Sequence, residues 1–508
     1  MSKALMVQGT GSGAGKSLLV TAFCRILKNR GLNVAPFKSQ NMALNSFVTA
    51  DGGEIGRAQA LQAEAARLKP TIDMNPILLK AQGESGCQVI IHGRVHSSMQ
   101  ARQYYAFKES AWKAAKASFD VLSKRHDLII IEGAGSPAEI NLMDVDIVNM
   151  KVAKYAKAPV LLVGDIDRGG VFASLYGTVK LLGRDRRCVR GYVINKFRGD
   201  IDILKPGLDI IHEKTAIPVI GVLPYFDCSG LSEEDGLALT QKSDVRSQKS
   251  GVKEVKIVVV RLKYISNFTD FDALMHENDV EVVFSDNPAD IENSDIVIIP
   301  GTKNTVKDLL FLLERGLDLS IKKAHAKGIM VVGLCGGYQM LGSKIYDPER
   351  IESTFAEMDG LGLLDIETSF ENIKNTCQTD AVIMSPQLED LFGIKSSGEE
   401  YRLRGYEIHM GTSSGDIGLF RLKRLAGDSE EVLDGSMKGC CWGTYLHGIF
   451  DNDSFRRTMI NSIRAKKGLN AINDGLNYAM MKDAAVDRLA SMVNNNIDME
   501  FIGRLLKL

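Results

Sequence analysis

Short apolar runs rich in β-branched residues recur along the first half of the chain. Between them lie longer stretches in which apolar residues return at the spacing of a helix. The runs occupy residues 4–7, 33–36, 128–131, 160–163, 191–194 and 219–222. Strands of a parallel sheet are buried on both faces and are joined by helices. The alternation therefore predicts an α/β domain with a parallel sheet.

A polar stretch at residues 241–254 interrupts this rhythm, and its Ser, Lys, Gln and Gly content is typical of a linker. A second alternation follows, with apolar runs at residues 256–260, 280–284, 296–299, 329–332, 406–409 and 441–445. After residue 450 the pattern becomes polar and helical. We expect an α/β domain at 1–240, a linker at 241–254, a second α/β domain at 255–450 and a helical extension at 451–508.

Composition and charge narrow the class of protein. The 508 residues are 45% hydrophobic and 25% charged, which is ordinary for a globular protein of several domains. With 62 basic and 63 acidic side chains the net charge is −1, so no overall positive field attracts nucleic acid or anionic lipid. The apolar runs are far shorter than the roughly 20 residues of a membrane-spanning helix. We therefore expect small-molecule substrates and no membrane or nucleic-acid partner.

The cysteines and the N-terminal residues indicate in which cellular compartment the protein is expected. The eight cysteines form no C-x-x-C pair, which favours a reducing environment. The first residues lead directly into a glycine-rich loop and lack the features of a signal peptide. We expect a cytoplasmic protein, and we leave open whether it forms a homo-oligomer.

The glycine-rich loop runs from Gly9 to Ser17 (GTGSGAGKS), between a predicted strand and a predicted helix. In a phosphate loop of this kind, backbone N–H groups and the helix N-terminus bind phosphates. The residues that we expect to bind ATP here are Thr10, Gly13, Gly15, Lys16 and Ser17. The loop is one residue longer than the common form and resembles the dethiobiotin-synthetase branch. Position 11 is glycine where positioning ATPases carry a second lysine, which argues against that non-enzymatic alternative.

A phosphate loop of this type needs Mg²⁺, and the sequence offers three oxygen ligands. The Ser17 hydroxyl belongs to the loop itself, and Glu132 directly follows the buried run at 128–131. Asp51, in a polar Asp-Gly-Gly turn, is a third candidate. The alternative for both acids is an ordinary solvated loop residue.

The second domain carries a candidate nucleophile, Cys335, in Gly-Leu-Cys-Gly-Gly between a predicted strand and a predicted helix. Small flanking residues allow the sharp turn of a nucleophile elbow. We expect His447 to be its base, with His409 as the rival. Backbone N–H groups at Gly301 and Gly336 are candidates for the oxyanion hole.

This arrangement is similar to that of class I glutamine amidotransferases. They place Glu two residues after the histidine, whereas position 449 is Ile here. Glu407 is a candidate substitute for this acid. A glutaminase joined to an ATP-binding domain suggests one chemistry, in which a carboxylate is activated as an acyl phosphate and then attacked by ammonia from glutamine.

Motifs along almost the whole chain to about residue 450 resemble the cobyric acid synthase family of cobalamin biosynthesis. They occur at residues 35–42 (APFKSQNM), 56–59 (GRAQ), 74–76 (MNP), 132–141 (EGAGSPAEIN), 165–170 (DIDRGG), 195–199 (NKFRG), 265–270 (ISNFTD), 405–411 and 443–448. The resemblance implies amidation of the b, d, e and g carboxylates of a corrinoid, adenosylcobyrinic acid a,c-diamide, with ATP and glutamine. The nearest alternative is cobyrinic acid a,c-diamide synthase, but the segments at 36–41 and 136–141 favour the first family.

The resemblance also assigns roles to residues. It implies Cys335 as the nucleophile with His447 as its partner, and Lys16, Ser17 and Glu132 at the nucleotide and Mg²⁺. It further implies that Lys38 neutralises charge during phosphoryl transfer. Asp146 is a candidate for holding the corrinoid, with a helix-capping role as the alternative. The family usually has Arg where Met143 stands and Lys-Pro where Lys80-Ala81 stands.

Overall fold

The computed structural model describes residues 2–82, 86–228, 230–231, 253–394, 401–425 and 430–508. These residues form two compact units, each described by itself. Unit 1 comprises 1–43, 54–232 and 482–508, and unit 2 comprises 44–53 and 233–481. Both units alternate strands and helices, which confirms the predicted α/β class.

The central sheet of unit 1 contains all six strands predicted in this part of the chain. Its strand order is β12-β11-β10-β1-β9-β2, and every pair is parallel. The strands are β1 (Lys3–Gly9), β2 (Val34–Phe37), β9 (Leu128–Glu132), β10 (Val160–Asp165), β11 (Val189–Phe197) and β12 (Val219–Pro224). The helices of this part are α1 (Lys16–Asn29), α2 (Arg57–Ala65), α3 (Ala101–Arg125), α4 (Met150–Ala156), α5 (Val171–Leu181) and α6 (Ile201–Thr215).

Two hydrophobic cores lie on opposite faces of this sheet, because successive side chains of a strand point to opposite sides. Ala4 and Met6 of β1 pack in one core, with side chains of α3, α4 and α5. Leu5 and Val7 pack in the other, with side chains of α1. The sheet is thus buried on both sides, as its continuous apolar strands predict.

A second, four-stranded sheet in unit 1 was not predicted. Its order is β3-β6-β7-β8, and the β6–β7 and β7–β8 pairs are antiparallel. Its strands are β3 (Gln40–Met42), β6 (Ile77–Gln82), β7 (Gly86–Ile91) and β8 (Arg94–Gln100), and β5 (Glu54–Gly56) lies between β3 and β6 in the sequence.

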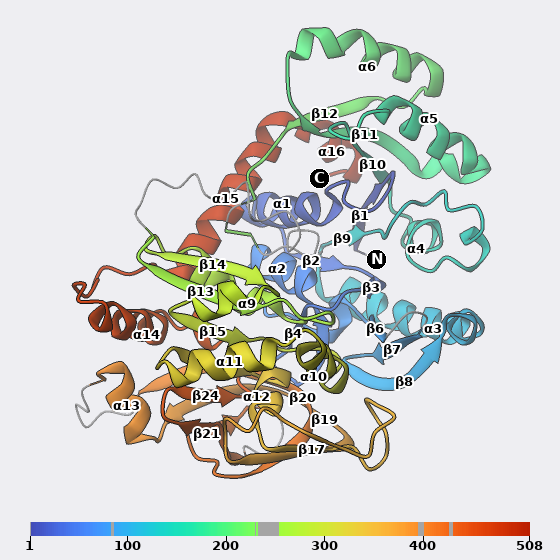
Figure 1. Cartoon of the computed structure of the whole chain (residues 1–508). Coiled ribbons are helices and arrows are strands. Elements are labelled where there is room, and N and C mark those ends of the chain that lie inside the picture. Colours follow the sequence, from blue (N-terminus) through green and yellow to red (C-terminus); the bar gives the residue numbers. More distant parts are fainter. Residues whose placement is uncertain (1, 83–85, 229, 232–252, 395–400, 426–429) are drawn as a thin grey trace. The chain divides into compact units, whose positions relative to one another are not determined.

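The C-terminal extension is helical, as predicted, but it divides between the units. α14 (Asp453–Lys466) belongs to unit 2. The unit boundary falls within α15 (Tyr478–Asn496), and α16 (Met499–Leu506) belongs to unit 1. Apolar side chains of these last two helices join the core that contains Leu5, so α15 lies beside α1 in Figure 1. The boundary predicted at residue 450 therefore does not separate one compact body from another.

The main sheet of unit 2 has the order β14-β13-β15-β16-β24-β23, parallel except for its last pair. The strands are β13 (Val255–Val260), β14 (Val280–Ser285), β15 (Ile296–Ile299), β16 (Met330–Leu334), β23 (Ser436–Lys438) and β24 (Cys441–Thr444). The helices are α8 (Asp272–Met275), α9 (Pro288–Glu292), α10 (Thr305–Glu314), α11 (Leu317–Ala326), α12 (Gly336–Leu341) and α13 (Pro386–Phe392).

A second sheet in unit 2 is mainly antiparallel and is built on two long paired strands, β19 (Ile366–Ile383) and β20 (Arg402–Gly415). The predicted run at 406–409 lies in the middle of β20. The other strands are β17 (Lys344–Tyr346), β18 (Glu357–Asp359), β21 (Phe420–Arg424) and β22 (Glu431–Asp434).

The segment 44–53, which contains β4 (Ser46–Val48), belongs to unit 2, although it was predicted to lie within a continuous domain at 1–240. Its Val48 side chain is buried with Tyr406 and Ile408, which explains the difference. Except for its last two residues, the predicted linker at 241–254 lies outside the described residues.

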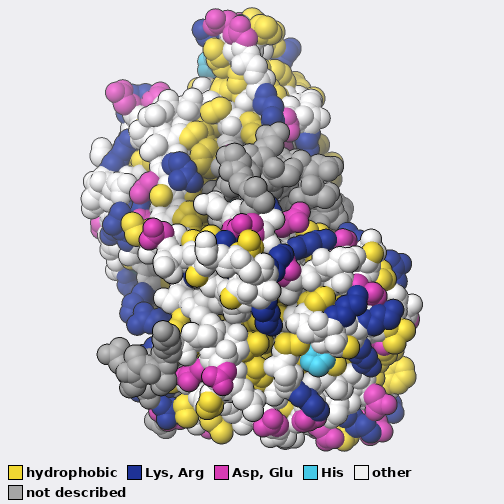
Figure 2. All heavy atoms as spheres, turned by 60° about the vertical axis from the view of Figure 1, so that its left-hand side comes forward, with side chains coloured by type: hydrophobic (Ala, Val, Ile, Leu, Met, Phe, Trp, Pro, Cys, Tyr) yellow, Lys and Arg dark blue, Asp and Glu magenta, His cyan; other side chains and the backbone are white. Residues whose placement is uncertain are grey.

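The surface carries both signs of charge. Figure 2 shows basic and acidic side chains interspersed over the face in view, which agrees with the net charge of −1. No helix among the described residues combines the length and apolarity needed to cross a membrane.

Candidate functional sites

The glycine-rich loop joins β1 to α1 in a shape that only its glycines allow. Gly13 and Gly15 have φ angles of +72° and +98°, a region that favours glycine. A Cβ at position 15 would lie 2.1 Å from Asn195 Nδ2. The same Asn195 nitrogen donates to Ala14 O at 2.9 Å, and Thr10 N donates to Val163 O at 2.9 Å. The loop is therefore held by the ends of β10 and β11.

Two lysines contact carbonyl groups around this loop. Lys16 Nζ donates to Gly11 O at 2.9 Å and to Gly135 O at 3.3 Å. Lys196 Nζ donates to Gly13 O at 2.9 Å and contacts the Asp165 carboxylate at 2.8 Å. Asn195, Lys196 and Asp165 lie in motifs of the sequence, but their support of the loop was not predicted. A helix N-terminus and the Lys16 ammonium favour an anionic ligand such as the phosphates of ATP, whereas the charge of Lys196 is paired with Asp165.

Glu132 lies at the end of β9 beside the start of α1, with 1% of its surface exposed. Its Oε1 accepts hydrogen bonds from Ser17 Oγ and from Lys38 Nζ, each at 2.8 Å. Its Oε2 accepts one from Gln62 Nε2 at 2.5 Å. Burial alone would raise the pKa of Glu132, but the Lys38 ammonium and these hydrogen bonds lower it. A buried carboxylate is thus kept ionised next to the phosphate loop.

The donor atoms here fit Mg²⁺. A hydroxyl and a carboxylate are hard oxygen ligands, and Mg²⁺ commonly uses one or two such groups together with phosphate oxygens and water. In the described part of the chain no group of three or more His, Cys, Asp or Glu side chains could hold a metal by itself. Asp51, the third candidate, belongs to unit 2, where it is exposed and accepts a hydrogen bond from Thr49 Oγ1 at 2.5 Å. Its part in binding Mg²⁺ stays a prediction.

Asp146 contacts its own loop. Its carboxylate accepts hydrogen bonds from Val148 N at 2.8 Å and from Asn149 N at 3.1 Å, just before α4. Burial raises the pKa of Asp146, and these backbone contacts partly oppose the rise. These contacts hold the loop before α4 and do not cap the helix, whose first residue is preceded by Asn149. A role of Asp146 toward the corrinoid stays a prediction.

Cys335 stands at a sharp turn between β16 and α12, with φ +50° and ψ −109°. A non-glycine residue rarely adopts a positive φ, which marks a strained position of the kind found at active sites. The flanking glycines make the turn possible, because a Cβ at position 337 would lie 2.0 Å from Ile299 O. This is the geometry of a nucleophile elbow.

His447 and Gly301 lie next to Cys335. A Cβ at position 301 would be 3.2 Å from His447 Cε1 and 3.7 Å from Cys335 Cβ. The imidazole is buried, and its Nε2 has no hydrogen-bond partner among the described residues. Gly336 follows Cys335 directly at the start of α12. The structure thus brings together the predicted nucleophile, the predicted base and both predicted oxyanion glycines.

Asp270 completes this arrangement and was not predicted. Its Oδ2 lies 2.7 Å from His447 Nδ1, and its Oδ1 accepts a hydrogen bond from Gly448 N at 3.0 Å. Burial alone would lower the pKa of His447, but the charges of Asp270 and Cys335 raise it to about 10. The imidazole is therefore kept protonated at neutral pH, in the state of a general acid.

The suggestion that Glu407 replaces the missing acid is wrong. Glu407 pairs with Arg424, at 2.8 Å and 3.0 Å, and with His409 Nε2 at 3.3 Å. Burial would raise the pKa of Glu407, but these partners lower it to about 2. The rival base His409 donates from Nδ1 to Gly411 O at 3.0 Å and stacks on Tyr445. These two residues form a separate polar pair.

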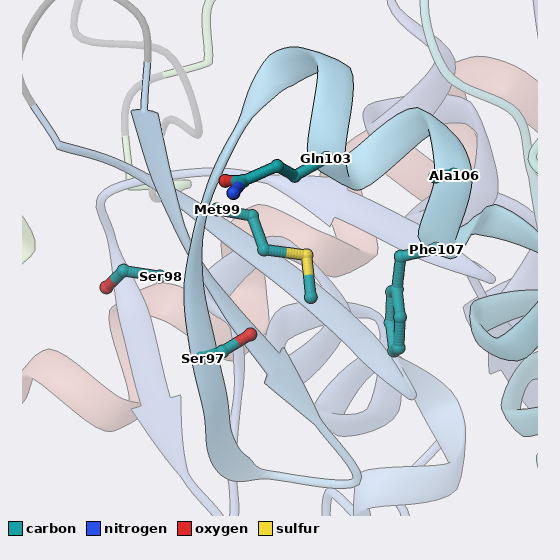
Figure 3. Close-up of a pocket in the computed structure, with 6 residues that line it drawn as sticks. All are labelled: Ser97, Ser98, Met99, Gln103, Ala106 and Phe107. Atoms are coloured by element: carbon teal, nitrogen blue, oxygen red, sulfur yellow. The ribbon is translucent and has the colours of Figure 1, made fainter.

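A shallow cavity of about 470 Å³ lies in unit 1 between β8 and the start of α3. Figure 3 shows it lined by residues of these two elements, among them Met99, Gln103 and Phe107. The lining residues carry no carboxylate, imidazole or amine, so this cavity has no candidate catalytic group.

Comparison with known proteins supports both candidate sites, because each lies in a segment that matches a known family. Residues 5–239 match the family described as the CobQ/CobB/MinD/ParA nucleotide binding domain, and residues 256–455 match the CobB/CobQ-like glutamine amidotransferase domain. The cobyric acid synthase of Thermodesulfovibrio yellowstonii is 49% identical over 98% of this chain and 98% of that protein. Those of Caldanaerobacter subterraneus and Thermoanaerobacter sp. are each 48% identical over 100% of this chain and 99% of theirs.

Proposed function

Because this chain belongs to the cobyric acid synthase family, we propose that its two sites divide one reaction between them. The chain is an ATP- and glutamine-dependent amidoligase of cobalamin biosynthesis. Unit 2 releases ammonia from glutamine, and unit 1 activates a corrinoid carboxylate. The substrate is adenosylcobyrinic acid a,c-diamide, whose b, d, e and g carboxylates become amides.

The observation that carries this assignment is the Cys335–His447–Asp270 arrangement in a chain that also contains a preformed phosphate loop. A thiolate nucleophile, an oriented imidazole and a supporting carboxylate are the parts that amide hydrolysis needs. A glutaminase alone would not require an ATP site. Free carboxylate and ammonia do not condense readily at neutral pH, so the two sites together favour amide synthesis.

In unit 2 the Cys335 thiolate attacks the side-chain amide carbon of glutamine. The C–S bond forms while the carbonyl oxygen becomes an oxyanion, which N–H groups at Gly301 and Gly336 would stabilise. His447 gives its Nε2 proton to the nitrogen as the C–N bond breaks and ammonia leaves. Water, deprotonated by His447, then hydrolyses the thioester to glutamate and restores Cys335.

In unit 1 a corrinoid carboxylate attacks the γ-phosphorus of ATP, which gives an acyl phosphate and ADP. Lys16 and Lys38 neutralise the charge that develops on the phosphoryl oxygens. Mg²⁺, which Ser17 and Glu132 would hold, supplies further neutralisation of phosphate charge. Ammonia then attacks the acyl carbon and phosphate leaves, which completes the amide.

The test compares two nitrogen sources for two variants. Adenosylcobyrinic acid a,c-diamide is incubated with ATP and Mg²⁺, with either glutamine or ammonium chloride, and mass spectrometry counts the amides added. Cys335→Ala should add none with glutamine but four with ammonium chloride. Glu132→Gln should add amides about 100-fold more slowly or worse with either source, while still hydrolysing glutamine.

Other outcomes would change the assignment. If the wild-type protein adds no amide to this substrate but two to cobyrinic acid, it is a diamide synthase. If Cys335→Ala still uses glutamine, the proposed nucleophile is wrong. ATP hydrolysis stimulated by a membrane or by DNA, without glutamine hydrolysis, would favour the positioning ATPase.

A further inference from the structure

The segment 44–53 contacts the candidate glutaminase centre, although its sequence lies within the match to the nucleotide-binding family at 5–239. The match to the glutamine amidotransferase family begins at residue 256 and therefore does not include these ten residues. Their contacts with the residues around Cys335 and His447 therefore call for a functional explanation.

The first set of contacts reaches the turn that carries Asp270. Asn45 Oδ1 accepts a hydrogen bond from Phe268 N at 3.1 Å, and Ser46 N donates to Asn267 Oδ1 at 3.1 Å. Asn267 has a φ angle of +51°, and its carbonyl accepts from Asp270 N at 3.0 Å. Asn45 and Ser46 thus bind Asn267 and Phe268, the first two residues of the turn that carries Asp270.

The second set reaches the other side of His447. The Phe47 ring lies 6.1 Å from the Tyr406 ring, which in turn stacks on the His447 imidazole at 5.2 Å and an interplanar angle of 16°. Tyr406 and His447 also exchange two backbone hydrogen bonds, at 3.1 Å and 2.8 Å. Val48 is buried against Tyr406, and its carbonyl accepts a hydrogen bond from Gln378.

We propose that Asn45 and Phe47 are positioning residues of the glutaminase, through which a segment of the nucleotide-binding sequence holds His447 against Asp270. The proposal rests on the proposed function of unit 2. Phe47 limits the movement of Tyr406, and the Tyr406 ring limits rotation of the imidazole. Asn45 fixes the turn beneath His447 Nδ1. Loss of either contact leaves the reacting groups present but less well aligned, which lowers the rate of the chemical step.

The chain on either side of the segment leads to the nucleotide site. Three residues upstream of Leu44, Asn41 Nδ2 donates to Gln59 Oε1 at 3.0 Å, and Gln59 Nε2 lies 3.4 Å from Glu132 Oε2. Downstream, Glu54 pairs with Lys80 at 2.5 Å. The residues that flank the segment are therefore held by buried polar contacts within unit 1.

The test is steady-state glutamine hydrolysis by the full-length protein. Phe47→Ala should lower kcat about 10-fold or more with little change in KM, because glutamine binding is not altered. The alkaline limb of its pH profile should move to lower pH, since a less well-held imidazole loses part of its interaction with Asp270. Phe47→Tyr should restore most of the rate. Asn45→Ala should act in the same direction as Phe47→Ala.

Three controls distinguish a loss of alignment at the glutaminase centre from a general loss of structure or of the ATP-dependent step. Phe355→Ala removes a half-exposed ring elsewhere in unit 2 and should leave the rate unchanged. Amidation with ammonium chloride should stay within about 2-fold of wild type in every variant. The rate of Cys335 alkylation by iodoacetamide as a function of pH reports thiolate formation without turnover.

Either of two results would overturn the proposal. They are an unchanged kcat and pH profile for both Phe47→Ala and Asn45→Ala, or a loss of ammonia-driven amidation equal to the loss of glutamine hydrolysis. Absence of glutamine hydrolysis in the wild-type protein would instead overturn the proposed function.

Discussion

At the scale of single residues, Asp270 has two contacts with the chain around His447, one to the imidazole and one to the next backbone N–H. The first fixes which ring nitrogen faces Cys335, and the second fixes the direction of the carboxylate. Because the carboxylate is negative, it favours the protonated imidazole and contributes to the raised pKa of His447. The Asp270 side chain therefore both orients the His447 imidazole and supplies the negative charge that favours its protonated form.

We expect Asp270→Asn to lower kcat for glutamine hydrolysis about 100-fold. The amide keeps the shape but removes the charge, so the pKa of His447 should fall. The alkaline limb of the pH profile reports loss of the imidazolium proton, and it should move to lower pH. The measurement is kcat for glutamate release between pH 6 and pH 10. Asp272→Asn, two residues along the chain, should leave the profile in place, and an equal effect of both variants would contradict the assignment.

At the scale of elements, α14 is held in unit 2 by buried arginines. Arg457 donates to Asp279 Oδ1 and Oδ2, each at 2.9 Å, and Arg464 also contacts Asp279 Oδ2 at 2.9 Å. Arg456 Nε donates to Glu277 at 2.7 Å. Burial would raise the pKa of Asp279, but these guanidinium groups lower it.

Arg457→Met should destabilise unit 2 by about 3–5 kcal/mol at pH 7, because it leaves the Asp279 and Glu277 charges partly uncompensated. The lowered pKa of Asp279 sets the pH dependence. Its contribution is present above the ordinary aspartate value of about 4 and is lost as pH falls through the lower folded value. Urea unfolding at several pH values should therefore show the difference from wild type shrinking below about pH 4.

The matched control for this prediction is Arg404→Met. Arg404 is 90% exposed and lies 3.6 Å from Asp380. An exposed pair of this kind contributes about 0–1 kcal/mol. A similar loss of stability in both variants would show that burial of the α14 pairs does not matter.

The sequence predicts elements well where burial is continuous. All the parallel strands of both main sheets were found, because each contains a run of apolar residues, although those of β12 and β14 are only partly buried. The β7 and β8 strands were missed, since β8 (RVHSSMQ) is exposed along much of its length and offers no apolar run. In β20 only residues 406–409 are buried in succession, and the rest of the strand alternates. Alternating strands carry a weaker signal when both faces contain polar residues.

The candidate sites show the same limit. Cys335, His447 and the phosphate loop have local signatures, in which glycines flank the reactive group. Asp270 has none, because it lies 177 residues from His447 in the sequence and meets it only through the fold. The one available signal was its place in the motif at 265–270. Glu407 was chosen because it is near in sequence, and this is a poor guide to which acid contacts an imidazole.

At the scale of the whole molecule, sequence order and compact units do not coincide. The chain passes between the units after residues 43, 53, 232 and 481. Leu489 of α15 and Ile502 of α16 are 1% and 0% exposed and pack in the core that contains Leu5 of β1. Lys3 Nζ also donates to Lys507 O at 2.5 Å. The two ends of the chain therefore stabilise the same sheet.

Leu489→Ala should destabilise unit 1 by about 2–5 kcal/mol, since it removes a buried side chain and leaves a cavity. Hydrogen exchange should show faster exchange in β1 and α1, while β13 and β16 of unit 2 keep their protection. Leu433→Ala, at a position that is 59% exposed, should change neither unit. Equal loss of protection in both units after Leu489→Ala would contradict this division.

This placement of the two chain ends also dictates an order of events during synthesis. Domains generally fold as units while the chain leaves the ribosome, the N-terminal one first. Here β1 emerges first, yet α15 and α16, which cover one face of its sheet, emerge last. The glutaminase unit ends at residue 481 and can close while those helices are still being made. The part of the enzyme that is translated first is thus the part that is finished last, because part of one apolar face of its sheet stays uncovered until α15 and α16 have been made.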